Sequence, residues 1–270
     1  IELYVMYLIF ICLIFVGVQE GMEAPSERNL IIDIVGLKYL TLGNSIAEFF
    51  NSFINSVGPL FVALLLISVE NVHLFWSLPL VQTISLIFAV LLFLNFKNPI
   101  PDNSQIYEKK SKSIKKGIHY SFNDVNIRIL LILATTVFFW GVSQPLIPKI
   151  ARDVLHIGQS GYGILIAAEG FGWMLGSILL SISPKLFRNS KSILVCIAMY
   201  AFSMILFALS GNFAVSIICL ILGGIFHLIW WTVIIIMLQT LSDNLHRGRV
   251  IGLFFALTQI NGLGFIIGGW

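Results

Sequence analysis

The chain has 270 residues, of which 58% are hydrophobic and only 11% are charged, and its mean hydropathy is +0.95. Soluble domains carry about 25% charged residues, so a water-soluble globular domain is excluded. The net charge of +3 is too small to indicate a nucleic-acid partner. Cys12, Cys196 and Cys219 lie in apolar runs without metal-ligand spacing, and bilayer depth is unsuited to a disulfide framework.

Eight apolar segments are long enough to cross a bilayer, because about 20 helical residues span a hydrocarbon core of roughly 30 Å. Backbone polar groups must be satisfied inside lipid, which favours helices, and the short alternating segments of a membrane barrel do not occur. The sequence therefore predicts an all-α membrane protein. In chain order, the predicted spans are residues 3–23, 41–66, 72–95, 127–148, 157–182, 191–210, 213–238 and 249–270.

The connections between these spans alternate in charge. Those at 24–40, 96–126, 183–190 and 239–248 are polar and basic, whereas those at 67–71, 149–156 and 211–212 are short. Of the 16 Lys and Arg residues, only Lys149 and Arg152 fall on the second side. The positive-inside rule then places the basic side in the cytoplasm. We expect a multi-pass protein of the cell (inner or plasma) membrane with loop 97–126 cytoplasmic, and we interpret the cluster at 109–116 as topological charge rather than a nucleic-acid or lipid patch.

The chain also carries a weak internal repeat. A shift of about 206 residues places Asn55 on Asn261 and Gly58 on Gly264, and the repeat unit would contain six helices. Two six-helix halves are a known transporter plan, with residues 1–96 completing the first bundle, 97–126 forming the central loop and 127–270 belonging to the second bundle. On this plan the visible helices are the fourth to the eleventh of twelve, with three expected before residue 1 and one after residue 270.

Several short motifs are spread over nearly the whole chain. They are Pro25-Ser26-Glu27-Arg28, Asp33-Ile34-Val35, Gly43-Asn44-Ser45, Val57-Gly58-Pro59, Gly158-Gln159-Ser160-Gly161-Tyr162-Gly163, Ala167-Ala168-Glu169-Gly170-Phe171-Gly172 with Gly176, and His246-Arg247-Gly248-Arg249-Val250. In sequence, order and spacing these motifs resemble those of major facilitator superfamily exporters, in the branch that includes macrolide-efflux proteins and the enterobactin exporter. The resemblance implies a two-bundle fold and identifies Arg28, Asp33, Arg247 and Arg249 as residues of cytoplasmic turns.

The resemblance also assigns a conformational motif to the fifth helix and its repeat copy. In antiporters of the superfamily a Gly-Pro pair is usually followed by two glycines. Here Gly58 and Pro59 lack those glycines, whereas the repeat copy has Gly264, Gly268 and Gly269 but no proline. Small residues let membrane helices approach closely, and an internal proline creates a bend point. These residues suit rocking of one bundle against the other, and static tight packing is the alternative.

Two ionisable residues are expected near mid-bilayer, where charge is costly and therefore marks function. Glu169 lies near the centre of the eighth helix, and we expect it to exchange a proton or bind cargo, with helix packing as the alternative. His227 lies near the centre of the tenth helix. It is expected to titrate or stack against cargo, or to serve only in packing.

A polar stripe is predicted on the fifth helix, where the spacing of 4, 3, 4 and 3 residues places five positions on one face: Asn44, Glu48, Asn51, Asn55 and Gly58. This face should meet a neighbouring helix or a water-filled cavity. Glu48 is a further proton-coupling candidate, or else a cytoplasmic gate or salt-bridge residue. The other candidates for lining a cavity, or for joining helices, are Trp140, Gln144, Trp230, Gln259 and Asn261.

Enzyme motifs are absent from the sequence, which has no phosphate-binding loop, no nucleophile elbow and no metal-ligand cluster. We therefore expect no cofactor and no metal, and an energy source in a gradient or the cargo. The predicted function is proton-coupled efflux of an amphipathic small molecule by a transporter that is monomeric when complete. An uptake symporter or facilitator, and a non-transporting scaffold or receptor subunit, are the alternatives.

Overall fold

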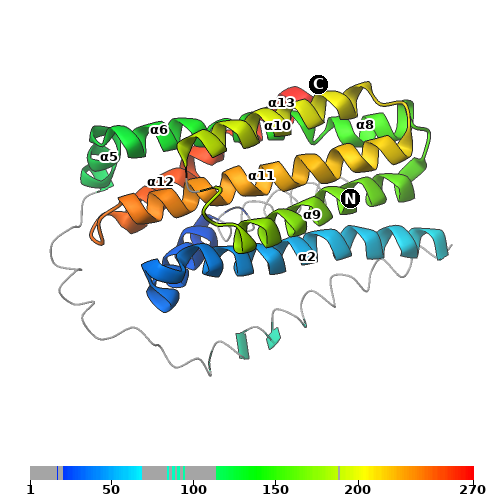
Figure 1. Cartoon of the computed structure of the whole chain (residues 1–270). Helices are drawn as coiled ribbons and strands as arrows, with labels where there is room; N and C mark the ends of the chain where they lie inside the picture. Colours follow the sequence, from blue (N-terminus) through cyan, green and yellow to red (C-terminus); the bar gives the residue numbers. More distant parts are fainter. Residues whose placement is uncertain are drawn as a thin grey trace, which may run out of the picture.

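The computed structural model describes residues 21–68, 114–187 and 189–270, with isolated positions between 17 and 94, and over these residues it is helical without a strand. The predicted spans 3–23 and 72–95 lie almost wholly outside the described residues. The long helices lie side by side in a bundle (Figure 1). Their bounds are a helix over 21–35, η1 (Leu37–Tyr39), α2 (Leu40–Ser68), α5 (Ile114–Asn123), α6 (Val125–Ala134), α7 (Val137–Ser143), α8 (Leu146–Asp153), α9 (Gly158–Ile182), α10 (Ser190–Leu209), α11 (Phe213–Leu241), α12 (Arg247–Thr258) and α13 (Asn261–Gly269).

The five predicted spans of the second half are confirmed as helices long and apolar enough to cross a membrane. They run over Val125–Asp153, Gly158–Ile182, Ser190–Leu209, Phe213–Leu241 and Arg247–Gly269. A sixth crossing is formed if the bent pair Gly21–Val35 and Leu37–Phe61 is taken as one span. The division into residues 1–96, 97–126 and 127–270 stays a prediction.

The polar connection at 24–40, for which the sequence predicted no helix of its own, is helical up to residue 35. This helix meets the following one at an angle of 110°. The reversal occurs at Gly36, whose φ of 67° lies in the left-handed region that glycine adopts without strain. Gly43 on α2 then faces the side chains of Ile31 and Val35, so the two helices pack closely after the turn. Residues 114–123 of the predicted loop are likewise helical, as α5.

Two of the confirmed spans are broken in the middle. Between α6 and α7, the hydroxyls of Thr135 and Thr136 donate to carbonyls three residues earlier, each at 2.7 Å, which bends a helix. Pro145 then separates α7 from α8 because it has no backbone N–H to continue the ladder. The last span is also interrupted near Gln259, between α12 and α13, although no proline lies there. In contrast, Pro59 lies inside an uninterrupted α2.

The central helix α11 packs against α9 on one side and α10 on the other, and α2 lies along α9 (Figure 1). Glycines set the distance between α9 and α11. A Cβ at Gly172 would collide with the carbonyl of Ile221, and one at Gly224 would collide with the carbonyl of Glu169. Gly170 faces α2, where a Cβ would lie 2.9 Å from the backbone of Ser56. The middle of α9 is therefore enclosed by both neighbouring helices.

Candidate functional site

Glu169 is buried in the middle of α9, with 3% of its surface exposed. Gln144 donates from Nε2 to both carboxylate oxygens, at 3.1 and 2.9 Å, and Trp140 donates from Nε1 at 3.2 Å. These two donors lie one turn apart at the end of α7. Among the described residues, Glu169 has no ion pair with a basic side chain. Within the described part of the chain, the carboxyl group is therefore held by neutral donors alone, and no basic side chain there would compensate a negative charge on it.

His227 is buried on α11 inside a cluster of aromatic rings. The ring centroids lie between 5.3 and 6.5 Å from that of His227, and the cluster consists of Trp140, Trp173, Tyr200, Trp230 and Trp231. Within this cluster, three buried ring nitrogens have no hydrogen-bond partner among the described residues: His227 Nδ1, Trp173 Nε1 and Trp230 Nε1. Because Trp140 contacts both Glu169 and the His227 ring, the two predicted ionisable residues belong to one site.

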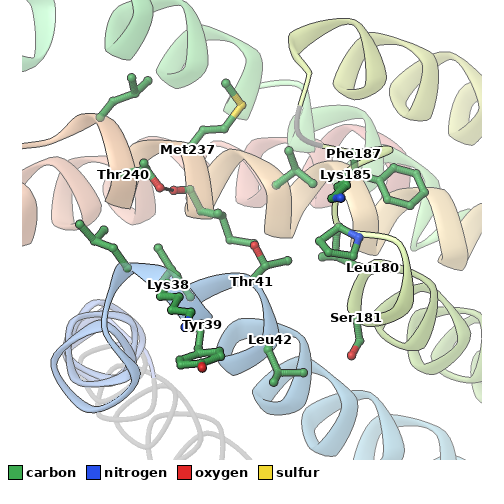
Figure 2. Close-up of a pocket in the computed structure, with 16 residues that line it drawn as sticks. Lys38, Tyr39, Thr41, Leu42, Leu180, Ser181, Lys185, Phe187, Met237 and Thr240 are labelled. Atoms are coloured by element: carbon green, nitrogen blue, oxygen red, sulfur yellow. Dashed lines mark hydrogen bonds between the residues drawn. The ribbon is translucent and has the colours of Figure 1, made fainter.

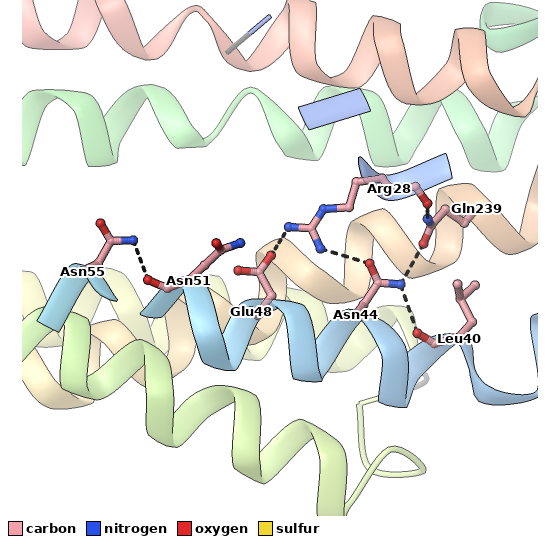
Figure 3. A network of polar contacts seen from close by, with 7 residues as sticks. All are labelled: Arg28, Leu40, Asn44, Glu48, Asn51, Asn55 and Gln239. Atoms are coloured by element: carbon pink, nitrogen blue, oxygen red, sulfur yellow. Dashed lines mark hydrogen bonds and ion pairs between the residues drawn. The ribbon is translucent and has the colours of Figure 1, made fainter. Parts of the chain in front are cut away.

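A second group of polar side chains joins the first half of the chain to α11 (Figure 3). Arg28 forms an ion pair with Glu48 and donates from Nη1 to Asn44 Oδ1 at 3.1 Å. Asn44 donates from Nδ2 to Gln239 Oε1 at 3.0 Å, and Gln239 Nε2 donates to the Arg28 carbonyl at 2.6 Å. All four side chains are buried. We call this group the inter-half network.

The polar stripe on α2 lies on one face as predicted, but its two ends differ in surroundings (Figure 3). Asn44 and Glu48 are buried within the inter-half network. Asn51 and Asn55 are exposed, and Asn55 Nδ2 donates to the Asn51 carbonyl at 2.9 Å within the same helix. The exposed end of the stripe is therefore available to water, cargo or another helix.

The glycines of the proposed conformational motif also divide into two groups. Gly264 and Gly268 of α13 meet the backbone of α7 so closely that a Cβ would collide with the carbonyls of Phe138 and Val142 respectively. At Gly58 and Gly269, a Cβ would have no neighbour within 4 Å in the described part of the chain. Of the four glycines of this motif, only Gly264 and Gly268 in α13 make the expected close contact with another helix among the described residues.

The remaining predicted site residues are spread over the bundle. Trp230 belongs to the aromatic cluster around His227, Gln259 is exposed and Asn261 is partly buried at the start of α13. Asp33 is exposed on the helix over 21–35, and Arg247 donates from Nε to the Gln239 carbonyl at 2.9 Å. The aliphatic part of Arg249 packs against Gly117 of α5.

Sequence reasoning missed two residues, Gln239 and Trp173. The only signal for Gln239 was a polar residue near the end of an otherwise apolar helix, a position that also suits a residue at the membrane surface. Trp173 lies one turn after Glu169 and resembles any aromatic residue of a core. Their roles depend on which helices surround them.

A family model described as transmembrane secretion effector matches residues 1–270. The chain is 29% identical over 124 residues to "Putative bacilysin exporter BacE" of Bacillus subtilis, covering 46% of this chain and 31% of that protein. It is 27% identical over 195 residues to "Uncharacterized MFS-type transporter YfmI" of Bacillus subtilis strain 168, covering 67% of this chain and 45% of that protein. The chain thus spans less than half the length of these curated relatives. No solved structure matches it.

Proposed function

Because the chain belongs to the transmembrane secretion effector family of the major facilitator superfamily, we propose that the complete protein is a proton-coupled exporter of an amphipathic small molecule, such as a drug, macrolide or siderophore. It works as a monomer in the inner or plasma membrane by alternating access. The observation that carries this proposal is the buried carboxyl group of Glu169, whose hydrogen-bond donors in the described part of the chain are all neutral.

Proton coupling follows from the cost of charge at this position. A carboxylate inside the bilayer is expensive unless a proton or a cation compensates it. Gln144 and Trp140 stabilise the charged form without neutralising it, so a proton from outside or a cationic group of the cargo completes the site. The two states exclude each other because they use the same oxygens, and this competition couples proton entry to cargo release.

The aromatic cluster around His227 supplies the rest of the binding surface. Aromatic rings offer apolar faces and edges to an amphipathic molecule, and three unpartnered nitrogens in the described part of the cluster remain available for hydrogen bonds. Trp140 links this cluster to Glu169. Cargo would therefore bind between the rings with its polar group near the carboxylate.

The inter-half network is proposed as the cytoplasmic latch between the two bundles. Separating the bundles at this end would break the Asn44–Gln239 hydrogen bond, and it would remove the acceptor that Gln239 finds in the Arg28 backbone. The Arg28–Glu48 pair stays within the first half because both residues belong to it. Opening the latch would therefore break only hydrogen bonds between uncharged groups, and neither Arg28 nor Glu48 would lose its ion-pair partner.

The test is transport by the complete protein in vesicles with an imposed pH gradient. Wild type should expel a fluorescent amphipathic dye and move protons in the opposite direction. Glu169→Gln should lose proton-driven efflux while it retains passive dye exchange, because the amide cannot release a proton. Asp153→Asn is the control, since Asp153 is an exposed carboxylate paired with Arg152 at the end of α8. Unchanged coupling in Glu169→Gln would remove Glu169 from the mechanism.

A further inference from the structure

A cavity of about 790 Å³ lies at the basic end of the bundle, on the seam between α2 and the second half of the chain (Figure 2). This volume falls within the roughly 300–1,000 Å³ typical of small-molecule sites. Three groups of residues form its walls. They are residues 37–42 before and at the start of α2, residues 180, 181, 184, 185 and 187 at and after the end of α9, and residues 233, 236, 237, 240 and 241 at the end of α11.

The position of this cavity along the bundle indicates its depth in the membrane. α2 begins at Leu40, α9 ends at Ile182 and α11 ends at Leu241. Three membrane helices therefore have their termini around one cavity. Helix termini of this kind lie near the boundary between hydrocarbon and headgroups, so the cavity opens where lipid headgroups are found.

The lining combines cationic and apolar groups. Lys38 and Lys185 enter from different sides, one from the segment before α2 and the other from the turn after α9 (Figure 2). Among the described residues that line the cavity, none is an Asp or Glu. Hydroxyl groups are present at Thr41 and Ser181, and most other lining side chains are apolar. Such a surface complements a ligand with an anionic head and a hydrocarbon tail.

We propose that this cavity binds an anionic phospholipid, with its phosphate between Lys38 and Lys185 and an acyl chain along the apolar wall of α9 and α11. A free phosphate would leave the apolar wall uncovered, and a zwitterionic lipid would place a second cation beside two lysines. Anionic lipids attract basic residues near the membrane surface. The bound lipid contacts both sides of the seam and therefore stabilises the two halves in this arrangement.

The experiment measures lipid retention on the purified complete protein. Native mass spectrometry compares phosphatidylglycerol with phosphatidylcholine of the same acyl chains. Wild type should retain phosphatidylglycerol preferentially. Each of Lys38→Gln and Lys185→Gln should weaken its binding by about fivefold, the effect of one basic residue near a membrane surface. Lys191→Gln is the matched control, because Lys191 is exposed at the start of α10 and does not line the cavity.

Two further measurements distinguish a lipid phosphate from free phosphate and check that variants at these positions fold. Inorganic phosphate should not displace the lipid, and the double Lys-to-Arg variant should bind as wild type does. Equal retention of both lipids, full displacement by inorganic phosphate, or wild-type binding by the double Lys-to-Gln variant would overturn the proposal. Binding is measured without transport, so the result is independent of the proposed function.

Discussion

The side-chain amide of Asn44 on α2 donates to the side-chain oxygen of Gln239 on α11 at 3.0 Å, and both residues are fully buried. The two residues lie 195 positions apart in the chain. Gln239 also donates to the Arg28 carbonyl. This contact connects α2 with α11, so the proposed latch can be tested by mutating either residue.

We expect Asn44 and Gln239 to be energetically coupled. In a double-mutant cycle with Asn44→Ala and Gln239→Leu, the coupling should fall in the range of about 0.5–3 kcal/mol found for residues in contact. Thermal unfolding in detergent, followed by Trp fluorescence, gives the measurement. Asn55→Ala combined with Gln239→Leu is the control and should be additive, because among the described residues Asn55 donates to the Asn51 carbonyl within α2 and not to Gln239. Additivity for Asn44 as well would show that the hydrogen bond contributes nothing.

Removing one member of the Arg28–Glu48 pair should be more damaging than removing both. Both side chains are below 10% exposed, and an unpaired buried charge costs about 3–5 kcal/mol. Glu48→Met or Arg28→Met alone should lower the stability by that amount. The double variant should recover much of the loss because no charge remains unpaired. Stability is measured by thermal unfolding, and a double variant less stable than either single one would contradict this view of the pair.

Substitution of Gly172 should force α9 and α11 apart. In Gly172→Ala the new methyl group would collide with the Ile221 carbonyl and would lie 3.0 Å from Gly224 Cα. Overpacking of this kind costs about 1–3 kcal/mol. Gly252→Ala on α12 is the matched control. Its methyl group meets no neighbour within 4 Å in the described part of the chain, and alanine is favoured over glycine in helices by about 1 kcal/mol. Equal stability of the two variants in thermal unfolding would refute the steric argument.

His227→Phe should fold as well as wild type, because a ring preserves the aromatic packing and removes the buried, unpartnered Nδ1. His227→Ala should be destabilised by about 3 kcal/mol or more, since it leaves a cavity among large side chains. Comparing unfolding temperatures with dye efflux separates the two interpretations of this residue. A stable His227→Phe variant without efflux supports a role in cargo binding, and one with full efflux shows that the histidine serves packing.

The sequence predicted the confirmed spans because lipid demands long apolar helices whatever their neighbours are. Glu169 and His227 were identifiable for the same reason, as ionisable residues where charge is costly. The helix over 21–35 was missed because its polar composition resembles a connection. Its folding depends on the reversal at Gly36 and on the packing of Ile31 and Val35 against Gly43.

The order and apolar character of the confirmed crossings were thus readable from residue chemistry alone, since each helix satisfies its backbone by local hydrogen bonds. The convergence of Trp140 on both Glu169 and His227, and of Gln239 on Asn44 and Arg28, was decided by tertiary structure. These contacts join segments far apart in the chain, and helical periodicity specifies which face a side chain occupies but not which helix it meets.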